Sequence, residues 1–205
     1  RPDLYEVRVV IKDSKSDVVL DQRCVTFGFK RVCLLPNPGV PDGLRPWTFE
    51  VNGVRTFIKG WNWVPVDELY GGSYLDKVER LVRLAAEANV NLLRVWGGGI
   101  IEKERFYDLC DRHGIMVWQE FPLSGSGIDN TPSTDPAYLD ELKRTAEAAV
   151  TMRRNHASLT VWCGGNELTW TGEEDPAMQV MHNVVSRFDP EGIFVPTSPM
   201  RTGIP

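Results

Sequence analysis

The sequence predicts an α/β fold built on a parallel sheet, and within that class the N-terminal half of a (β/α)8 TIM barrel. Short strands that are apolar along their whole length alternate with segments of helical period, which is typical of a parallel sheet covered by helices. Polar or aromatic side chains follow these strands, as they do at the active-site edge of a barrel. The chain has 205 residues and a closed barrel takes about 250, so only the first half is expected.

Composition excludes several classes of protein. Hydrophobic residues make up 42% of the chain, charged residues make up 25%, and the formal net charge is -5. This is a globular composition without a basic run, so we expect no nucleic-acid partner. No apolar stretch is long enough to span a membrane, and Arg1-Pro2-Asp3 does not begin a signal peptide, so we expect no membrane association. The compartment stays open.

The four cysteines are scattered, without the spacing of zinc ligands, so no metal site is expected. Cys24 and Cys33 could form a disulfide if two neighbouring strands brought them together, and the sequence leaves this open.

The first part of the chain has a strand pattern of its own. Alternating apolar residues over 5–11, a polar turn over 12–17 and the run Val18-Val19-Leu20 predict a hairpin. We assign residues 1–34 to the C-terminal strands of a β-sandwich. Prolines and glycines then mark a linker over 35–46, which leaves 47–205 for the half barrel.

Within 47–205, turn and cap residues separate the predicted elements. Asn52-Gly53 predicts a hairpin turn, because both residues tolerate positive φ. Helices are expected at about 74–88, beginning at Ser73, and at about 102–113, ending at Gly114. Asp135-Pro136 and Asp175-Pro176 each combine an N-cap with a proline at N1 and begin two more helices. The predicted strands are 56–58, 91–95, 115–118 and 159–162, with a fifth near 192–195.

A doubly wound open sheet is the rival to the barrel. A nucleotide-binding sheet of that kind needs a glycine-rich loop after its first strand, whereas this chain has the bulky Gly60-Trp61-Asn62-Trp63 there. Functional side chains instead follow each strand in turn, which favours the barrel. They are Asn62, Trp63 and Asp67, then Arg94 and Trp96, then Gln119 and Glu120, and finally Asn166 and Glu167.

Glu167 is the strongest catalytic candidate. Gly164 and Gly165 allow the backbone to bend after the fourth strand, which would present Asn166 and Glu167 over the barrel mouth. In a tryptophan-rich pocket the Glu167 carboxyl would be partly desolvated, and the raised pKa would let it serve as a general acid. Asn166 could donate to a substrate hydroxyl. An isolated Asn-Glu pair more often caps a loop, so the interpretation depends on the wider pattern.

That wider pattern is a set of segments whose order and spacing match a known family from about Trp47 to Pro199. The segments are Asn62-Trp63-Val64-Pro65-Val66-Asp67, Leu93-Arg94-Val95-Trp96-Gly97-Gly98-Gly99, Phe106-Tyr107-Asp108-Leu109-Cys110-Asp111, Val117-Trp118-Gln119-Glu120-Phe121, Arg154-Asn155-His156 and Trp162-Cys163-Gly164-Gly165-Asn166-Glu167. On these segments the chain resembles glycoside hydrolase family 2, in its β-mannosidase branch. Residues 1–34 also resemble the last strands of the immunoglobulin-like domain that precedes the barrel in this family.

The resemblance implies a retaining exo-glycosidase that hydrolyses terminal β-mannosides with two glutamates. Glu167 matches the acid/base, and the nucleophile has no counterpart in this chain. The implied chemistry needs no metal or cofactor, and the implied partners are a carbohydrate substrate and the rest of the barrel from a longer chain. We therefore expect the 205-residue piece alone to be inactive.

The resemblance also implies substrate-binding roles. Arg94 would hold a carboxylate near the nucleophile, or form a salt bridge inside the barrel. Trp63 and Trp96 could offer flat faces to a pyranose, or fill the barrel mouth. Asp67 could accept from a sugar hydroxyl or cap a helix. Glu120 would line the pocket, although many relatives have Asp there.

Three alternatives remain. Relatives share the Arg-Val-Trp-Gly-Gly-Gly and Gly-Asn-Glu segments, so β-glucosaminidase and endo-β-mannosidase are possible activities. A non-catalytic carbohydrate-binding module is the third. Val64-Pro65-Val66-Asp67 favours mannosides weakly.

Overall fold

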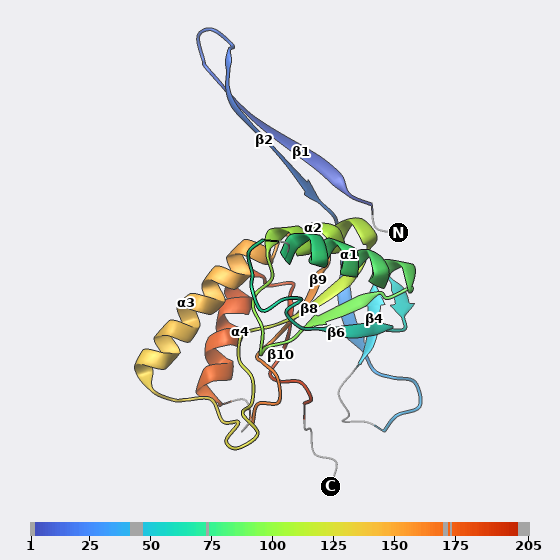
Figure 1. Ribbon diagram of the computed structural model, residues 1–205, viewed down its shortest axis with the longest axis vertical. Helices are drawn as coiled ribbons and strands as arrows, with labels where there is room; N and C mark the ends of the chain where they lie inside the picture. Colours follow the sequence, from blue (N-terminus) through green and yellow to red (C-terminus); the bar gives the residue numbers. More distant parts are fainter. Residues whose placement is uncertain (1–2, 42–46, 73, 170–171, 173, 201–205) are drawn as a thin grey trace.

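The computed structural model describes residues 3–41, 47–72, 74–169, 172 and 174–200 (Figure 1). Its centre is a five-stranded parallel sheet in the order β10-β9-β8-β7-β6. The chain therefore adds each strand beside the previous one, without the reversal of strand order that marks a doubly wound sheet. The predicted α/β class and barrel order are confirmed. The strands are β6 (Gly60–Trp63), β7 (Leu92–Val95), β8 (Met116–Glu120), β9 (Leu159–Cys163) and β10 (Ile193–Val195).

One helix separates each pair of consecutive strands. Both predicted Asp-Pro starts are confirmed, because Asp135 and Asp175 each accept from two backbone N–H groups of the first turn. Gly114 ends α2 with a φ of 70°, as predicted. The predicted cap Ser73 lies outside the described residues. The helices are α1 (Tyr74–Glu87), α2 (Glu104–His113), α3 (Pro136–Arg153) and α4 (Pro176–Phe188). None of them, within the described chain, has the length and apolarity to cross a membrane.

The predicted first strand of the sheet, 56–58, is wrong. The apolar residues there suggested burial, but Phe57 is 83% exposed. The parallel strand begins at Gly60, where a Cβ atom would lie 2.4 Å from the carbonyl oxygen of Leu92. A glycine is therefore needed for this close approach of two backbones.

The segment before β6 forms a hairpin of its own. β4 (Thr48–Val51) and β5 (Val54–Thr56) pair in antiparallel fashion around Asn52 and Gly53, whose φ angles of 50° and 80° confirm the predicted turn. β3 (Val32–Leu35) extends this sheet along β4.

The small sheet packs onto the parallel sheet. Phe49 of β4 belongs to a buried cluster with Leu92, Val161, Cys163 and Val195 of the parallel strands. The predicted unit 1–34 thus shares a sheet with the predicted unit 47–205. The division into 1–34, 35–46 and 47–205 stays a prediction, and residues 42–46 of the linker lie outside the described residues.

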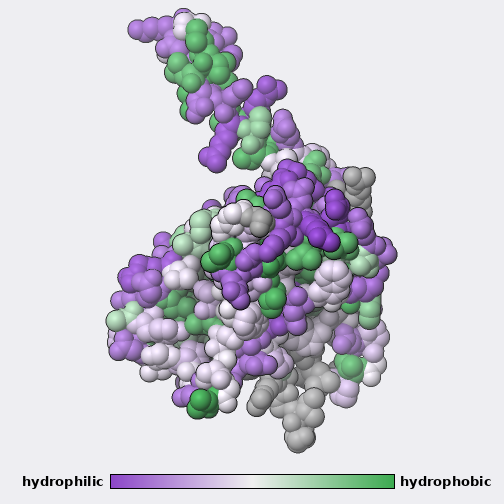
Figure 2. Space-filling model, viewed as in Figure 1, coloured by the Kyte–Doolittle hydropathy of each residue, from purple (hydrophilic) through white to green (hydrophobic). Residues whose placement is uncertain are grey.

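The N-terminal hairpin projects away from the rest of the chain (Figure 1). β1 (Tyr5–Lys12) and β2 (Val19–Phe27) pair over their length, which confirms the predicted hairpin. Hydrophobic side chains are exposed on it, as Figure 2 shows, and Val9 is 56% exposed. Its membership of a β-sandwich stays a prediction. Cys24 in β2 and Cys33 in β3 are both free thiols.

The main core lies between the parallel sheet and its helices, and it contains a buried carboxylate. Trp63 donates from Nε1 to Oε1 of Glu102 at 2.9 Å, and the Tyr74 hydroxyl donates to the same oxygen at 2.6 Å. Trp63 is 5% exposed and its ring packs on Phe106. The predicted stacking of Trp63 on a sugar is therefore wrong, and the alternative packing role holds. Satisfying Glu102 requires the indole, which draws the ring into the core.

Replacing Trp63 should reveal this structural role. Trp63→Phe removes one of the two donors to Oε1 of buried Glu102, and we expect the free energy of unfolding to fall by about 1–3 kcal/mol. Urea denaturation measures this change in the free energy of unfolding. The matched control is Trp61→Phe, because Trp61 is 44% exposed and should change stability by less than about 0.5 kcal/mol. Equal effects of the two substitutions would contradict the role of Trp63.

The cap of α3 gives a second stability test. Asp135→Ala leaves the amides of Ala137 and Tyr138 without their acceptor, so the free energy of unfolding should fall by about 1 kcal/mol. Asp140→Ala, at an exposed position in the same helix, is the control. A loss at residue 140 as large as that at residue 135 would argue against the cap.

Candidate active site

The carboxyl ends of four neighbouring strands bring polar side chains into one network around Arg94 at the end of β7. Its Nε donates to Oε1 of Glu120 in β8 at 2.9 Å, and Nη2 lies 2.8 Å from the same oxygen. Nη1 donates to Oδ1 of Asn62 in β6 at 3.0 Å, and Nη2 to Oδ1 of Asn166 after β9 at 2.7 Å. One guanidinium therefore connects four strands.

Glu120 is the buried anchor of this network. Its side chain is 0% exposed, and its Oε2 accepts from the backbone N–H of Gly97 at 2.7 Å. Burial raises the pKa of Glu120, while the charge of Arg94 and the hydrogen bonds oppose the shift. The predicted sugar contact of Glu120 is wrong, because both oxygens already accept hydrogen bonds and no oxygen reaches the surface. The salt bridge foreseen as the alternative for Arg94 is present.

Asn166 and Glu167 follow β9 through Gly164 and Gly165. A Cβ at Gly165 would meet the carbonyl oxygen of Leu123 at 2.6 Å, so glycine allows the two strand ends to approach. Asn166 is half-buried and its Nδ2 lies 3.3 Å from Oγ of Ser124. The predicted bend after β9 therefore places Asn166 inside the network.

Glu167 has a left-handed backbone with a φ of 53°, and its amide donates to the carbonyl oxygen of Ser198 at 2.9 Å. Such a conformation is uncommon for a residue with a side chain, and it is often found at functional sites. The predicted partial burial of the Glu167 carboxyl is wrong in this structure, because the residue is exposed. The described parallel strands form an open sheet with two edges.

The other two predicted site residues lie outside the network. Trp96 is half-buried, and its ring lies where a Cβ of Gly98 would come within 2.0 Å, so Gly98 makes room for the indole. Asp67 forms an ion pair with Lys77 and accepts from the amide of Leu69. The hydrogen bond from Lys77 lowers the pKa of Asp67. A sugar contact of Trp96 or Asp67 stays a prediction.

Two members of the network were not singled out as site residues in the sequence. Asn62 was noted only among the polar residues after the first strand, because that strand was placed too early. With β6 at its true position, Asn62 pairs with Arg94 across the sheet. Ser124 belongs to a loop without regular pattern, and its contact with Asn166 leaves no signal in the sequence.

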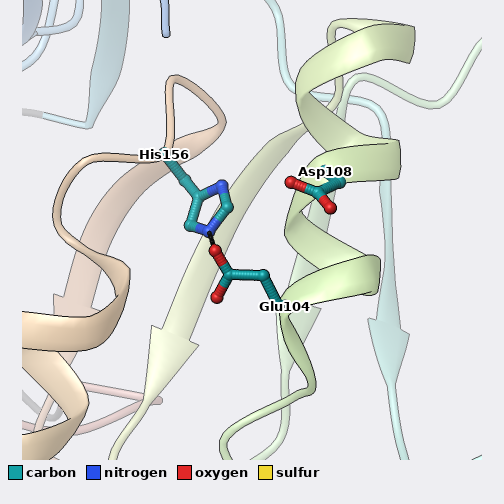
Figure 3. Close-up of side chains that lie close together, drawn as sticks. All are labelled: Glu104, Asp108 and His156. Carbon is teal, nitrogen blue, oxygen red and sulfur yellow. Dashed lines mark ion pairs between the residues drawn. The ribbon is translucent and has the colours of Figure 1, made fainter. Parts of the chain in front are cut away.

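A second cluster of titratable groups surrounds His156, before β9. The ring Nδ1 lies 2.8 Å from Oδ2 of Asp111. The ring Nε2 lies 3.2 Å from Oε1 of Glu104 (Figure 3). His156 is thus a buried hydrogen-bonding residue.

Figure 3 also shows Asp108 facing the ring, and the ligand atoms of Glu104, Asp108 and His156 lie within 4.8 Å of one another. These three groups could hold a metal ion. Arg153 already pairs with Glu104, however, so the cluster is accounted for as an ion-pair network.

A cavity of about 380 Å³ opens near this cluster, lined by Lys30, Asn91, Asp111, Ser158 and others. Its lining includes residues that precede β7, β8 and β9, so it lies at the amino ends of the strands. Barrel enzymes carry their chemistry at the opposite, carboxyl ends. The network around Arg94 is therefore the candidate active site.

Comparison with known proteins finds relatives of this chain among the β-mannosidases. β-Mannosidase B of Thermothelomyces thermophilus is 36% identical over 164 residues, which are 80% of this chain and 18% of that protein. Mannosylglycoprotein endo-β-mannosidase of Lilium longiflorum is 35% identical over 147 residues, 69% of this chain and 15% of that protein. The crystal structure of β-D-mannosidase from Dictyoglomus thermophilum has a TM-score of 0.77 at 34% identity, over 96% of this chain and 25% of that chain.

The chain thus spans a quarter or less of each of these proteins. Residues 44–191 match the family described as "Glycosyl hydrolases family 2, TIM barrel domain". That range contains the whole network from Asn62 to Glu167. With the strand order, the site at the carboxyl ends and the sequence identities in agreement, the chain belongs to glycoside hydrolase family 2.

Proposed function

We propose that the protein to which this chain belongs is a retaining exo-β-mannosidase that releases terminal β-mannosides. The observation that carries the proposal is the Asn166-Glu167 pair at the carboxyl edge of β9, joined through Asn166 to the Arg94 network. The similarity to β-mannosidases supports the choice of sugar.

Glu167 is the proposed acid/base. It is exposed at the carboxyl ends of the strands, where a glycosidic oxygen can reach it. In the first step Glu167 donates a proton to the departing oxygen, while a carboxylate from another part of the protein attacks the anomeric carbon. In the second step Glu167 removes a proton from a water molecule as the water oxygen attacks the anomeric carbon, and the bond between that carbon and the carboxylate breaks to release the sugar. Retention requires the two carboxyl groups to lie about 5–5.5 Å apart.

Asn166 and Arg94 are the proposed substrate-site residues. The Nδ2 group of Asn166 lies beside Ser124 and is a donor for a sugar hydroxyl. Arg94 is 18% exposed in its side chain, so part of the guanidinium can act on the proposed nucleophile, whose charge it would stabilise. Trp96 and Asp67 are further candidates for sugar contacts, at the rim of the same edge.

The second candidate function is an endo-β-mannosidase. The similarity to the lily enzyme favours it. It would use the same proposed proton donor and differ in how the rest of the pocket accepts an internal mannose. The exo- and endo-β-mannosidase activities are both proposed for the whole protein.

Glu167→Gln in the complete protein tests the acid/base. Without the proton donor, turnover of a natural β-mannoside should fall by about 10²–10⁴-fold. A substrate with a good leaving group needs no proton, so its glycosylation of the enzyme should persist and appear as a burst. Glu191→Gln is the matched control, because Glu191 is exposed and precedes β10 at the amino end. Undiminished hydrolysis of the natural substrate by Glu167→Gln would refute the assignment.

A panel of substrates tests the sugar. The complete protein should hydrolyse 4-nitrophenyl β-mannoside and release terminal mannose from β-linked oligosaccharides, with little action on 4-nitrophenyl N-acetyl-β-glucosaminide. Release of products from internal linkages alone would favour the endo enzyme. Binding of mannosides without turnover would favour a non-catalytic carbohydrate-binding module.

A further inference from the structure

We propose that Glu120 is a positioning residue that holds Arg94 and, through it, sets which way the amide of Asn166 faces. The inference rests on the proposed function, because it concerns how the same site presents a hydrogen-bond donor to the substrate. Glu120 itself touches no substrate, since its side chain is 0% exposed.

The environment of Glu120 consists of donors. Oε1 accepts from Nε of Arg94 at 2.9 Å, with Nη2 at 2.8 Å and the Cys163 thiol at 3.6 Å. Oε2 accepts from the amide of Gly97 at 2.7 Å. An ionised carboxylate accepts at both oxygens and has no donor of its own, so it matches this set of donors. The backbone amide of Gly97 fixes the Glu120 carboxylate, and the carboxylate in turn fixes the orientation of the Arg94 guanidinium.

The fixed guanidinium determines the amide of Asn166. Arginine has only donors, so the atom of Asn166 that lies 2.7 Å from Nη2 must be the carbonyl oxygen. The Nδ2 group is then forced to the other side, toward Ser124 and the open edge of the site. The same logic applies to Asn62, whose Oδ1 accepts from Nη1. Glu120 thus fixes the orientation of the side-chain amides at two strand ends, those of β6 and β9.

The substitution Glu120→Gln would disrupt these hydrogen bonds. A glutamine has one acceptor and one donor group, so its NH₂ would face either Arg94 or the amide of Gly97, and both are donors. The resulting repulsion releases the guanidinium, and the amide of Asn166 can then turn. A misplaced group in an active site can cost about 10²-fold in rate.

Kinetics of the complete protein test the proposal through a double-mutant cycle. Glu120→Gln should lower kcat on a β-mannoside by about 10²-fold, with KM changed little, because the hydrogen bond that Asn166 donates to the sugar strengthens in the transition state. In an Asn166→Ala background the same substitution should lower kcat by less than about 10-fold, because the Asn166 amide is already absent and only the action of Arg94 on the proposed nucleophile is disturbed.

Two further variants separate positioning from stability. Glu102→Gln changes another buried glutamate, one that is bound by Trp63 and Tyr74 outside the network. It should lower the unfolding temperature without the kcat effect. Glu120→Asp keeps the charge but is one methylene too short to span Arg94 and Gly97. It should give an intermediate loss of kcat with the same dependence on Asn166, and it replaces Glu120→Gln in the cycle if that variant fails to fold.

The outcomes distinguish the two proposals. If the wild-type protein hydrolyses β-mannosides but the effects of the Glu120 and Asn166 substitutions multiply, Glu120 acts independently of Asn166 and the positioning role is overturned. A rise in KM as the main effect of Glu120→Gln would overturn it as well. If the wild-type protein hydrolyses no glycoside, the proposed function fails, and this inference fails with it.

Discussion

The site depends on a buried ion pair between Arg94 and Glu120. Charges inside a barrel are costly to desolvate, and a pair is retained only when its remaining donors and acceptors are also satisfied. Here the backbone of Gly97 completes the carboxylate, and Asn62 and Asn166 complete the guanidinium. Every contact crosses from one strand end to another. The pair therefore couples the relative positions of β6, β7, β8 and the end of β9.

Glycines make this arrangement sterically possible. A Cβ at Gly97 would lie 2.3 Å from the carbonyl oxygen of Leu123, and one at Gly125 would lie 2.7 Å from that of Glu167. The loops after β7, β8 and β9 thus approach one another through bare backbone. Gly165 allows a similarly close contact with the backbone of Leu123. A larger residue at position 165 would separate the end of β9 from the loop after β8, and Asn166 and Glu167 would then lie farther from the site.

The sequence was informative where one residue type has one dominant structural role. Asp135-Pro136 and Asp175-Pro176 begin helices and Asn52-Gly53 forms a turn, because few other conformations suit those pairs. The prediction at Phe57 was wrong, because residue type alone does not distinguish an apolar side chain in the exposed connection between β5 and β6 from one in a core strand. Burial of Trp63 and Glu120 could not be predicted from residue type, because it depends on partners about 26 to 39 positions away in the chain.

The strand order of the parallel sheet also bears on how the protein is made. Because β6 to β10 lie side by side in the order of synthesis, each new strand pairs with the one completed just before it. Contacts of short range in sequence form quickly, so the sheet can assemble progressively as the chain leaves the ribosome. The Arg94 guanidinium would acquire Asn62, Glu120 and Asn166 in that sequence, and its last partner would arrive only with the loop that bears Glu167.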